Sequence, residues 1–411
     1  MAEDRSYWAD ISANWRILLG ATLGLGFGLG LNAYTMSLFG PRLIAEFGWT
    51  KSEFALVGTF SLLMLVAQPI AGRLADRHGV RAVAAVGVIG LPFTFLIYAT
   101  LAGDIRHFYL AMLVQMVVGT FTTTPIYSRL VAERIVRARG LAFAIVMSGP
   151  PLAGFVVAPT LDAYITAFGW RHGYLLLGGL SLVFGSLALL LMPARHPSSI
   201  QQASRPRAQR RGDYVTISRS AMFWLIFAGM LLINLPQTLL TSQFKLMLVD
   251  GGAGAETAAR FISLLAVGVL IGRFACGLAL DRLPTHLVAA VCLALPAMGF
   301  LLLASPFDST PMLLAGVIML GFAQGSEGDI VAYLVARHFG LDVFSLVMSL
   351  MIGSMVLGSS MGAVLLSISL GWFDNYVPFM FLASGVTMAG ALLFLLLGLL
   401  PSAGRTAARS G

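Results

Sequence analysis

Arg273 has the strongest potential for chemistry in this chain, because it lies inside an apolar run, residues 257–280, that is long enough to cross a membrane. About eight helical residues, or roughly 12 Å, separate it from the charged end of that run. A cation at such depth is costly unless it faces water or an anion, so it predicts a functional site. Its guanidinium is permanently charged and matches the planar geometry of a carboxylate. We predict that Arg273 binds an organic anion; the alternative is a structural ion pair with an acid on a neighbouring helix.

Two acids, Glu327 and Asp329, are the other charges that fall deep inside an apolar run, residues 310–336. They lie about 200° apart around a helix and cannot share one face, whereas Asp329 and Tyr333 are four residues apart and do. One acid is predicted to carry a proton together with the anion, and Tyr333 to orient the substrate. The alternative is that an acid neutralises Arg273 or satisfies backbone groups beside the flanking glycines.

Neutral polar residues in other apolar runs are predicted to complete the substrate site. Such side chains also hydrogen-bond helices to one another, so each has a packing role as its alternative. The candidates are Asn32 and Tyr34 in the first run, Gln115 in the fourth, and Asn234 and Gln237 in the seventh.

Charged residues at the ends of two apolar runs are predicted to gate transport. They lie at equivalent places in the two halves of the chain, where ion pairs can hold helix ends together in one state and release them in another. The alternative is simple solvation of loop charges. The gating residues are Asp76, Arg77 and Arg81 in the first half, and Asp281 and Arg282 in the second.

Composition places all these residues in a membrane. Hydrophobic residues make up 58% of the 411 residues, charged residues only 11%, and the mean hydropathy is +0.87. Soluble domains have about 25% charged residues, and the runs lack the alternation of membrane strands, so helices must satisfy the backbone. We predict an all-α membrane protein with twelve transmembrane helices near residues 15–39, 53–73, 80–102, 107–130, 140–166, 172–193, 219–246, 257–280, 284–304, 310–336, 341–368 and 375–400.

The twelve helices are predicted to form two six-helix bundles, residues 1–193 and 219–411, joined by a linker at 194–218. Arginines are frequent in the linker, and its prolines disfavour helix. Most of the 26 lysines and arginines fall on the linker's side of the predicted membrane. By the positive-inside rule, the linker and both termini are therefore predicted to be cytoplasmic.

The two halves repeat one another, which predicts parallel six-helix repeats like those of alternating-access transporters, with the substrate site between the halves. The motif from Gly72 to Arg77 recurs from Gly277 to Arg282, and two further matches occur at nearly the same offset. At this point the chain resembles the major facilitator superfamily, because the segment from Gly72 to Arg81 looks like that superfamily's motif between helices 2 and 3. The resemblance covers essentially the whole chain and implies the major facilitator fold.

Within that superfamily the chain is similar to the monocarboxylate porter branch, especially its bacterial members. The resemblance rests on residues 47–52 before the second helix, residues 168–171 before the sixth, and Arg273 in the eighth. In that branch the equivalent arginine is the implied binder of the substrate carboxylate, and bacterial members imply the inner membrane. Two features depart from the pattern: Val269 stands where many of these porters have an aspartate, and glycines at 24–30 replace an acidic-glycine signature typical of animal members.

The prediction is a secondary transporter that moves a small organic anion, a monocarboxylate, together with protons by alternating access. Two alternatives remain, an efflux transporter for amphipathic drugs and a non-transporting membrane sensor or scaffold. Neither an enzyme nor a cofactor, metal or nucleic-acid site is expected, because no phosphate-binding Gly-Lys-Ser/Thr loop or catalytic constellation is present, and all six histidines map to loops or span ends. The expected partners are the anion, protons and the lipid bilayer, with the oligomeric state open.

Overall fold

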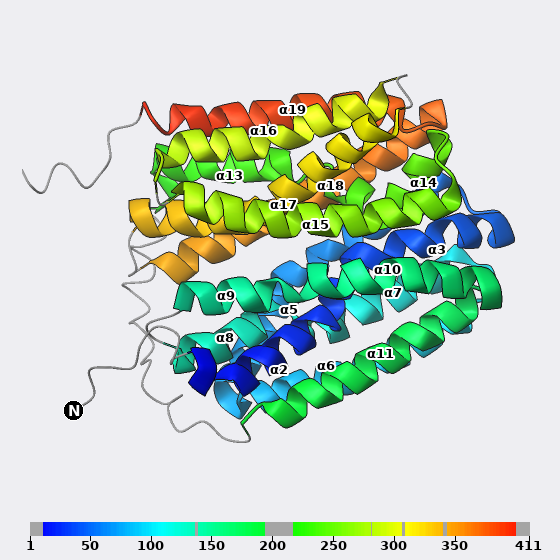
Figure 1. The fold of residues 1–411 in the computed structure, drawn as a ribbon, viewed down its shortest axis with the longest axis horizontal. Helices are drawn as coiled ribbons and strands as arrows, with labels where there is room; N and C mark the ends of the chain where they lie inside the picture. The colour runs from blue at the N-terminus through cyan, green and yellow to red at the C-terminus, as the bar shows by residue number, and fades with distance from the viewer. Residues whose placement is uncertain are drawn as a thin grey trace, which may run out of the picture. The chain divides into compact units, whose positions relative to one another are not determined.

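The computed structural model describes residues 11–135, 139–193, 217–280, 282–305, 309–339 and 343–399, and every element within these ranges is a helix (Figure 1). Nine of the described helical stretches are long and apolar enough to cross a membrane, and a tenth is added if one bent pair of helices counts as a single span. The all-α membrane fold class is therefore confirmed. The remaining two of the twelve predicted spans stay predictions.

The helices of the first half begin with a bent pair and continue in an order that follows the predicted spans. Short 3-10 turns at Leu29–Leu31, Leu56–Leu63 and Thr120–Thr122 interrupt or extend them. The α-helices are α2 (Trp15–Gly26), α3 (Asn32–Phe47), α4 (Lys51–Ala55), α5 (Met64–His78), α6 (Val80–Ala99), α7 (Ile105–Gly119), α8 (Thr124–Arg134), α9 (Arg139–Met147), α10 (Gly149–Phe168) and α11 (Trp170–Leu191).

The helices of the second half are fewer and longer. A π-helical turn, Leu239–Gln243, lies between the first two of them. They are α13 (Ala221–Ile233), α14 (Phe244–Asp250), α15 (Ala255–Leu280), α16 (Thr285–Ala304), α17 (Thr310–Phe339), α18 (Phe344–Phe373) and α19 (Val377–Leu396).

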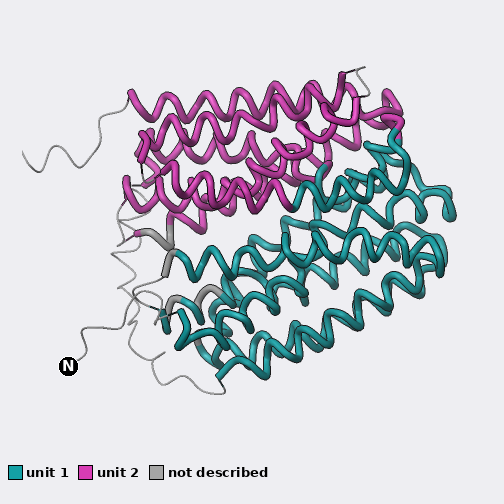
Figure 2. Tube along the Cα trace, in the orientation of Figure 1, with its two compact units in different colours: residues 1–202, 240–249, 253–266 teal, residues 203–239, 250–252, 267–411 magenta. Residues whose placement is uncertain are grey.

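The first compact unit consists of residues 1–202, 240–249 and 253–266 (Figure 2, teal). Buried aromatic rings stack within it: the ring centroid of Tyr174 lies 3.8 Å from that of Phe39 and 4.9 Å from that of Tyr98. A second cluster joins α2, α5, α6 and α8 around Tyr127 and other buried side chains. The ring contacts include Phe39 of α3, the helix that carries Asn32.

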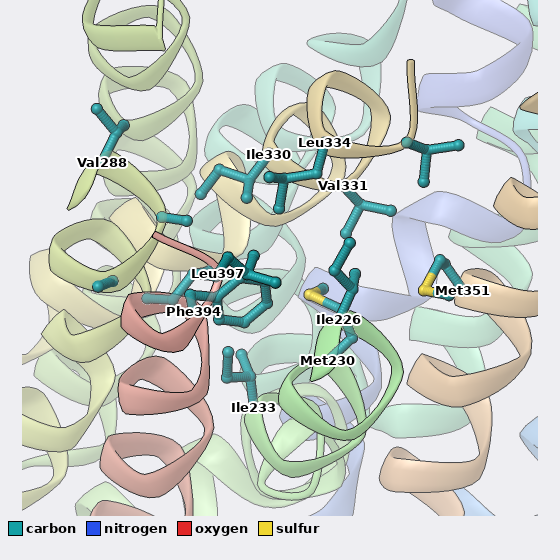
Figure 3. Close-up of a cluster of buried hydrophobic side chains, with 14 of the residues drawn as sticks. Ile226, Met230, Ile233, Val288, Ile330, Val331, Leu334, Met351, Phe394 and Leu397 are labelled. Carbon is teal, nitrogen blue, oxygen red and sulfur yellow. The ribbon is translucent and has the colours of Figure 1, made fainter. Parts of the chain in front are cut away.

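The second compact unit consists of residues 203–239, 250–252 and 267–411 (Figure 2, magenta). Its core joins α13, α16, α17, α18 and α19. Figure 3 shows Ile330 and Leu334 of α17 within this cluster, together with Ile226 and Met230 of α13 and Phe394 of α19. One face of α17 is thereby held against its neighbours, which sets the direction of the polar residues on its other faces.

Two predicted spans are broken rather than continuous. Helices α2 and α3 meet at an angle of 52°. An ideal Cβ on Gly28, at the break, would lie 2.6 Å from Thr122 Oγ1, so the chain passes there only because glycine has no side chain. The seventh predicted span is interrupted by the turn at 234–236 and by the π-helical turn that precedes α14.

The predicted domain boundaries at 193 and 219 stay predictions. Residues 194–216, which make up nearly all of the predicted linker, lie outside the described residues. The compact units also differ from a simple division at the linker, since 240–249 and 253–266 pack with the first unit.

Candidate functional site

Arg273 lies where α15 and α17 are in backbone contact within the second unit. An ideal Cβ on Gly272 would lie 2.0 Å from the Phe322 carbonyl oxygen, and one on Gly325 would lie 2.0 Å from the Val269 oxygen and 3.0 Å from the Arg273 nitrogen. Two helices approach this closely only where small residues face each other. The close packing of α15 against α17 therefore fixes the backbone position of Arg273.

Ser326 adds a polar link at the same crossing. Its hydroxyl donates hydrogen bonds to the Gly272 carbonyl of α15, at 3.2 Å, and to the Phe322 carbonyl of its own helix, at 2.8 Å. The contact supports the register between the helices that carry Arg273 and the acidic residues.

The Arg273 side chain is half-buried, and its Nε has no hydrogen-bond partner among the described residues. Within the described part of the chain it forms no ion pair, although Asp329 of α17 attracts it at longer range. Buried donors without a partner are rare in folded proteins and require an explanation. A charged donor that is held in place and left partly unsatisfied is suited to binding an anion.

Glu327 and Asp329 occupy different environments, as their angular separation predicts. Glu327 is buried, and the amide of Asn234 donates a hydrogen bond to its carboxylate. Asp329 is half-buried and is attracted to Arg273. The structure thus places Asp329 within electrostatic range of the arginine and Glu327 beside Asn234.

The remaining predicted substrate residues of the second unit lie near the break before α14 or beside the core. Asn234 also donates a hydrogen bond to the Met230 carbonyl, at 3.0 Å, and the Gln237 N–H donates to the Asn234 carbonyl, at 3.1 Å. Tyr333 is partly buried and packs against the hydrophobic cluster of the second unit. Asn234 therefore joins Glu327 of α17, whereas Tyr333 also has a packing role.

Gln324 is a candidate site residue that sequence reasoning missed. Its Oε1 is buried and has no hydrogen-bond partner in the part of the chain that the structure describes. It directly precedes Gly325, whose backbone abuts the Arg273 nitrogen, and successive Cα atoms are only about 3.8 Å apart. An unsatisfied acceptor thus lies one residue from the contact with the arginine. The only signal in the sequence was its place immediately before the glycine-rich acidic segment.

The predicted substrate residues of the first unit form a buried polar group. Asn32 Nδ2 donates to Gln115 Oε1 at 2.7 Å, and the Tyr98 hydroxyl donates to the same oxygen at 3.2 Å. Gln115 is only 1% exposed. Tyr34 packs over Gly154, where an ideal Cβ would lie 2.4 Å from its Cγ. Asn32 and Gln115 are therefore brought together, and these bonds also join α3 to α7.

The predicted gating residues are only partly within the described structure. Arg77 and Arg282 are exposed and Arg81 is half-buried. Asp281 and the side chain of Asp76 lie outside the described residues. The proposed charge pairs at these helix ends therefore stay predictions.

Comparison with known families decides the class of the protein. The family model of the Major Facilitator Superfamily matches residues 20–342. The chain belongs to this superfamily. Among solved structures, a mutant of the nucleoside transporter NupG is 12% identical and superposes with a TM-score of 0.77 over 93% of this chain and 99% of that chain. At this identity, the similarity to NupG shows the major facilitator fold alone.

Curated relatives within the superfamily include transporters of carboxylates. Human monocarboxylate transporter 11 is 24% identical over 93% of this chain and 82% of its own length. The 4-hydroxybenzoate transporter PcaK of Pseudomonas aeruginosa is 27% identical over 92% of each chain. The protein is therefore a multi-pass membrane transporter of the Major Facilitator Superfamily and not an enzyme.

Proposed function

We propose that this protein is a secondary transporter of a small monocarboxylate, driven by protons, in a bacterial inner membrane. The observation that carries the proposal is the half-buried Arg273 guanidinium, which is held at a helix crossing and has no paired carboxylate among the described residues. The relatives named for monocarboxylate and 4-hydroxybenzoate transport support the same substrate class. Arg273 binds the carboxylate in this proposal.

Asp329 supplies the coupling to protons. When Asp329 is ionised it attracts Arg273 and weakens the positive field available to a substrate. When it is protonated, the charge of Arg273 is free to attract the carboxylate. Proton and anion therefore favour each other's binding, and this reciprocal coupling supports symport.

Gln324 supplies a second contact for the substrate. The unsatisfied Oε1 of Gln324 accepts a hydrogen bond from a hydroxyl group of the substrate, while the Arg273 guanidinium donates hydrogen bonds to the substrate carboxylate. A hydroxycarboxylate carries both groups and is the substrate class that satisfies both atoms. Buried polar atoms of a binding site discriminate strongly against analogues that lack the matching group.

Uptake by proteoliposomes tests the proposed function directly. The substrates are propionate, 2-hydroxypropionate, benzoate, 4-hydroxybenzoate and succinate, each measured at two external pH values with the internal pH fixed. We expect saturable uptake of monocarboxylates that rises as the external pH falls. Uptake of amphipathic cations without uptake of any acid would instead support drug efflux and remove the proposal.

Asp329→Asn is expected to abolish proton-driven accumulation while retaining exchange of substrate across the membrane. Asparagine is permanently neutral and mimics the protonated acid, so Arg273 stays available but no proton is carried. The measurement is accumulation under an inward proton gradient against counterflow at equal pH. Glu327→Gln is the matched control and should keep accumulation, because Glu327 bonds to Asn234 and not to the arginine. A coupling defect in the control alone would transfer the role to Glu327.

Gln324→Leu is expected to lower the affinity for hydroxylated acids by about tenfold, as one net hydrogen bond is lost. The affinity for propionate and benzoate should change by less than about twofold, since these acids cannot use the contact. Competition assays with the pairs propionate and 2-hydroxypropionate, and benzoate and 4-hydroxybenzoate, measure the difference. Equal losses for both members of each pair would count against the contact.

A further inference from the structure

The only two cysteines of the chain, Cys276 and Cys292, meet inside the second unit. Cys276 belongs to α15 and Cys292 to α16; both are buried free thiols in the hydrophobic cluster of that unit. A side-chain hydrogen bond joins the two thiols, and each thiol also has one with the Ser326 hydroxyl of α17. Three helices thus contribute one polar side chain each to a single buried place. Cys276, Cys292 and Ser326 form the thiol cluster.

Helix α17 is the common neighbour that holds the thiol cluster together. The Ser326 hydroxyl donates to the Gly272 carbonyl of α15, which lies one turn before Cys276. An ideal Cβ on Gly299 of α16 would lie 2.9 Å from the Gly316 carbonyl oxygen of α17, so these two helices are also in backbone contact. Close packing on both neighbours leaves the two sulfur atoms little freedom to move apart, which preorganises them as a pair.

A pair of thiols can do chemistry that one buried cysteine cannot. A single free cysteine in an apolar core behaves as a small hydrophobic residue and needs no further explanation. Two sulfur atoms together are a ligand set for a soft metal ion such as Cu⁺. Structural zinc sites need four ligands, and the described residues contain no group of three or more Cys, His, Asp or Glu side chains that could hold a metal. The pair therefore suits an ion that accepts two ligands in line, as the d¹⁰ ions Cu⁺ and Ag⁺ do.

The predicted orientation favours metal binding over disulfide formation. Helix α15 ends at Leu280, four residues or about 6 Å after Cys276. This end of the helix is predicted to face the cytoplasm. Reducing compartments keep thiols reduced, and paired cysteines there are more often metal ligands or catalytic groups than disulfides. The two thiols are therefore expected to stay available as ligands.

We propose that Cys276 and Cys292 form a two-coordinate site for a soft monovalent d¹⁰ ion of the Cu⁺ or Ag⁺ type. The ion takes the place of one thiol proton, which leaves to solvent, and binds the thiolate of one cysteine and the thiol sulfur of the other. The complex has no net charge, so it avoids the cost of burying a charge. It is also not repelled by Asp329, which lies within electrostatic range of Cys276.

An ion in this site is expected to lower carboxylate uptake as well, and this part rests on the proposed function. An ion between the two sulfur atoms must shift α15 at Cys276, one turn after Gly272. The backbones of α15 and α17 are already in contact at Gly272 and Gly325, so the crossing has no free space to absorb the shift. Arg273 is displaced with it. A shift of about 1 Å in a binding group can cost about 100-fold in rate.

Retention of silver by the purified full-length protein tests the site. Ag⁺ is the probe because, unlike Cu⁺, it resists oxidation to the divalent state. Titration of the denatured protein should find both cysteines as free thiols; none would indicate a disulfide and overturn the proposal. After incubation with silver nitrate and dialysis against a competing monothiol, we expect one Ag⁺ per chain. X-ray absorption at the silver edge should show two sulfur neighbours, and a single sulfur neighbour would overturn the site.

Serine variants separate a paired site from two independent thiols. Cys276→Ser and Cys292→Ser each leave one thiol and should lose Ag⁺ at about 100-fold lower concentrations of the competing thiol, because a second ligand held nearby raises affinity by about 10²–10⁴. The matched control combines Cys292→Ser with Ser181→Cys, which restores a second buried thiol but places it on α11 in the first unit. This control should retain Ag⁺ no better than Cys292→Ser. Parental retention in the control, or in either single variant, would overturn the proposal.

Initial rates of carboxylate uptake in proteoliposomes test the effect on transport. Loading with Ag⁺ should lower the rate by about tenfold or more in the parent protein and leave the rates of both serine variants unchanged. Undiminished uptake by the silver-loaded parent would overturn the effect on transport. If no carboxylate is transported even without Ag⁺, the proposed function fails, and silver retention alone decides the metal site.

Discussion

Arg273→Gln is expected to abolish carboxylate uptake while leaving the protein folded in the membrane. A carboxylate bound by the guanidinium gains two charge-assisted hydrogen bonds, each contributing about 1.5–3 kcal/mol, and about 1.4 kcal/mol corresponds to a factor of ten. The loss in kcat/KM is therefore expected to be about 100-fold or larger. Arg273→Lys keeps the charge but loses the planar guanidinium, so its kcat/KM should fall between those of the parent protein and Arg273→Gln. Initial uptake rates in proteoliposomes measure the effect, and thermal unfolding of the purified protein checks the fold.

A second arginine on the same helix provides the control for this experiment. Arg260 lies near the start of α15, forms a 2.6 Å ion pair with Glu256, and has a side chain that is 70% exposed. Exposed pairs of this kind contribute little to stability, and Arg260→Gln should leave uptake unchanged. Wild-type affinity in Arg273→Gln would remove the anion site. Equal loss in both variants would point to an effect of net charge and not of the site.

The sequence singled out Arg273 because its depth in an apolar run can be read along one chain, and it named Asp329 together with Glu327 as candidate proton carriers. An arginine many residues from the end of an apolar run is recognisable without a structure. The helical angle between Glu327 and Asp329 also predicted that they have different neighbours, and one lies near Asn234 while the other lies near Arg273. Whether these residues bind the substrate stays a prediction.

The hydrogen bonds that the Asp162 carboxylate accepts from Arg42 and Lys245 could not be predicted in the same way. Asp162 was recognisable only as an acid near the outer end of its span, and Lys245 as a basic residue at another span end. Their meeting depends on contacts between residues 83 positions apart. It also depends on the break before α14, because a continuous seventh helix was predicted where a π-helical turn is present. The pattern of a single sequence predicts which face of a helix is apolar or polar, but it does not predict which other helix packs against that face.

Gln324 was missed for a related reason. A glutamine inside an apolar run has a packing role as its usual interpretation, and many such residues link helices. Two features distinguish Gln324. The neighbouring Gly325 lies close to the backbone of Arg273, and the Oε1 of Gln324 accepts no hydrogen bond from the described residues. Both facts depend on the packing of two helices and neither is visible in residue order.

Gly325→Ala is expected to disable transport although it adds only one methyl group. The new Cβ would lie 2.0 Å from the Val269 carbonyl oxygen and 3.0 Å from the Arg273 nitrogen, so α17 must move away from α15. Overpacking of this kind typically costs about 1–3 kcal/mol, and backbone atoms cannot swing aside as a flexible side chain can. A shift of about 1 Å in a binding group can cost about 100-fold in rate. We therefore expect a lowered melting temperature together with loss of carboxylate uptake.

Gly328→Ala is the matched control, because it places the same methyl group on the same helix, three residues further and beside Asp329. An ideal Cβ there meets no atom of the described residues within 4 Å. Alanine is favoured over glycine in helices by about 1 kcal/mol, so this variant should be as stable as the parent or slightly more stable. If Gly325→Ala retains parental uptake and stability, the close crossing of α15 and α17 does not position Arg273. If both variants lose uptake alike, the glycines act through the flexibility of α17, and the contact with α15 is not what matters.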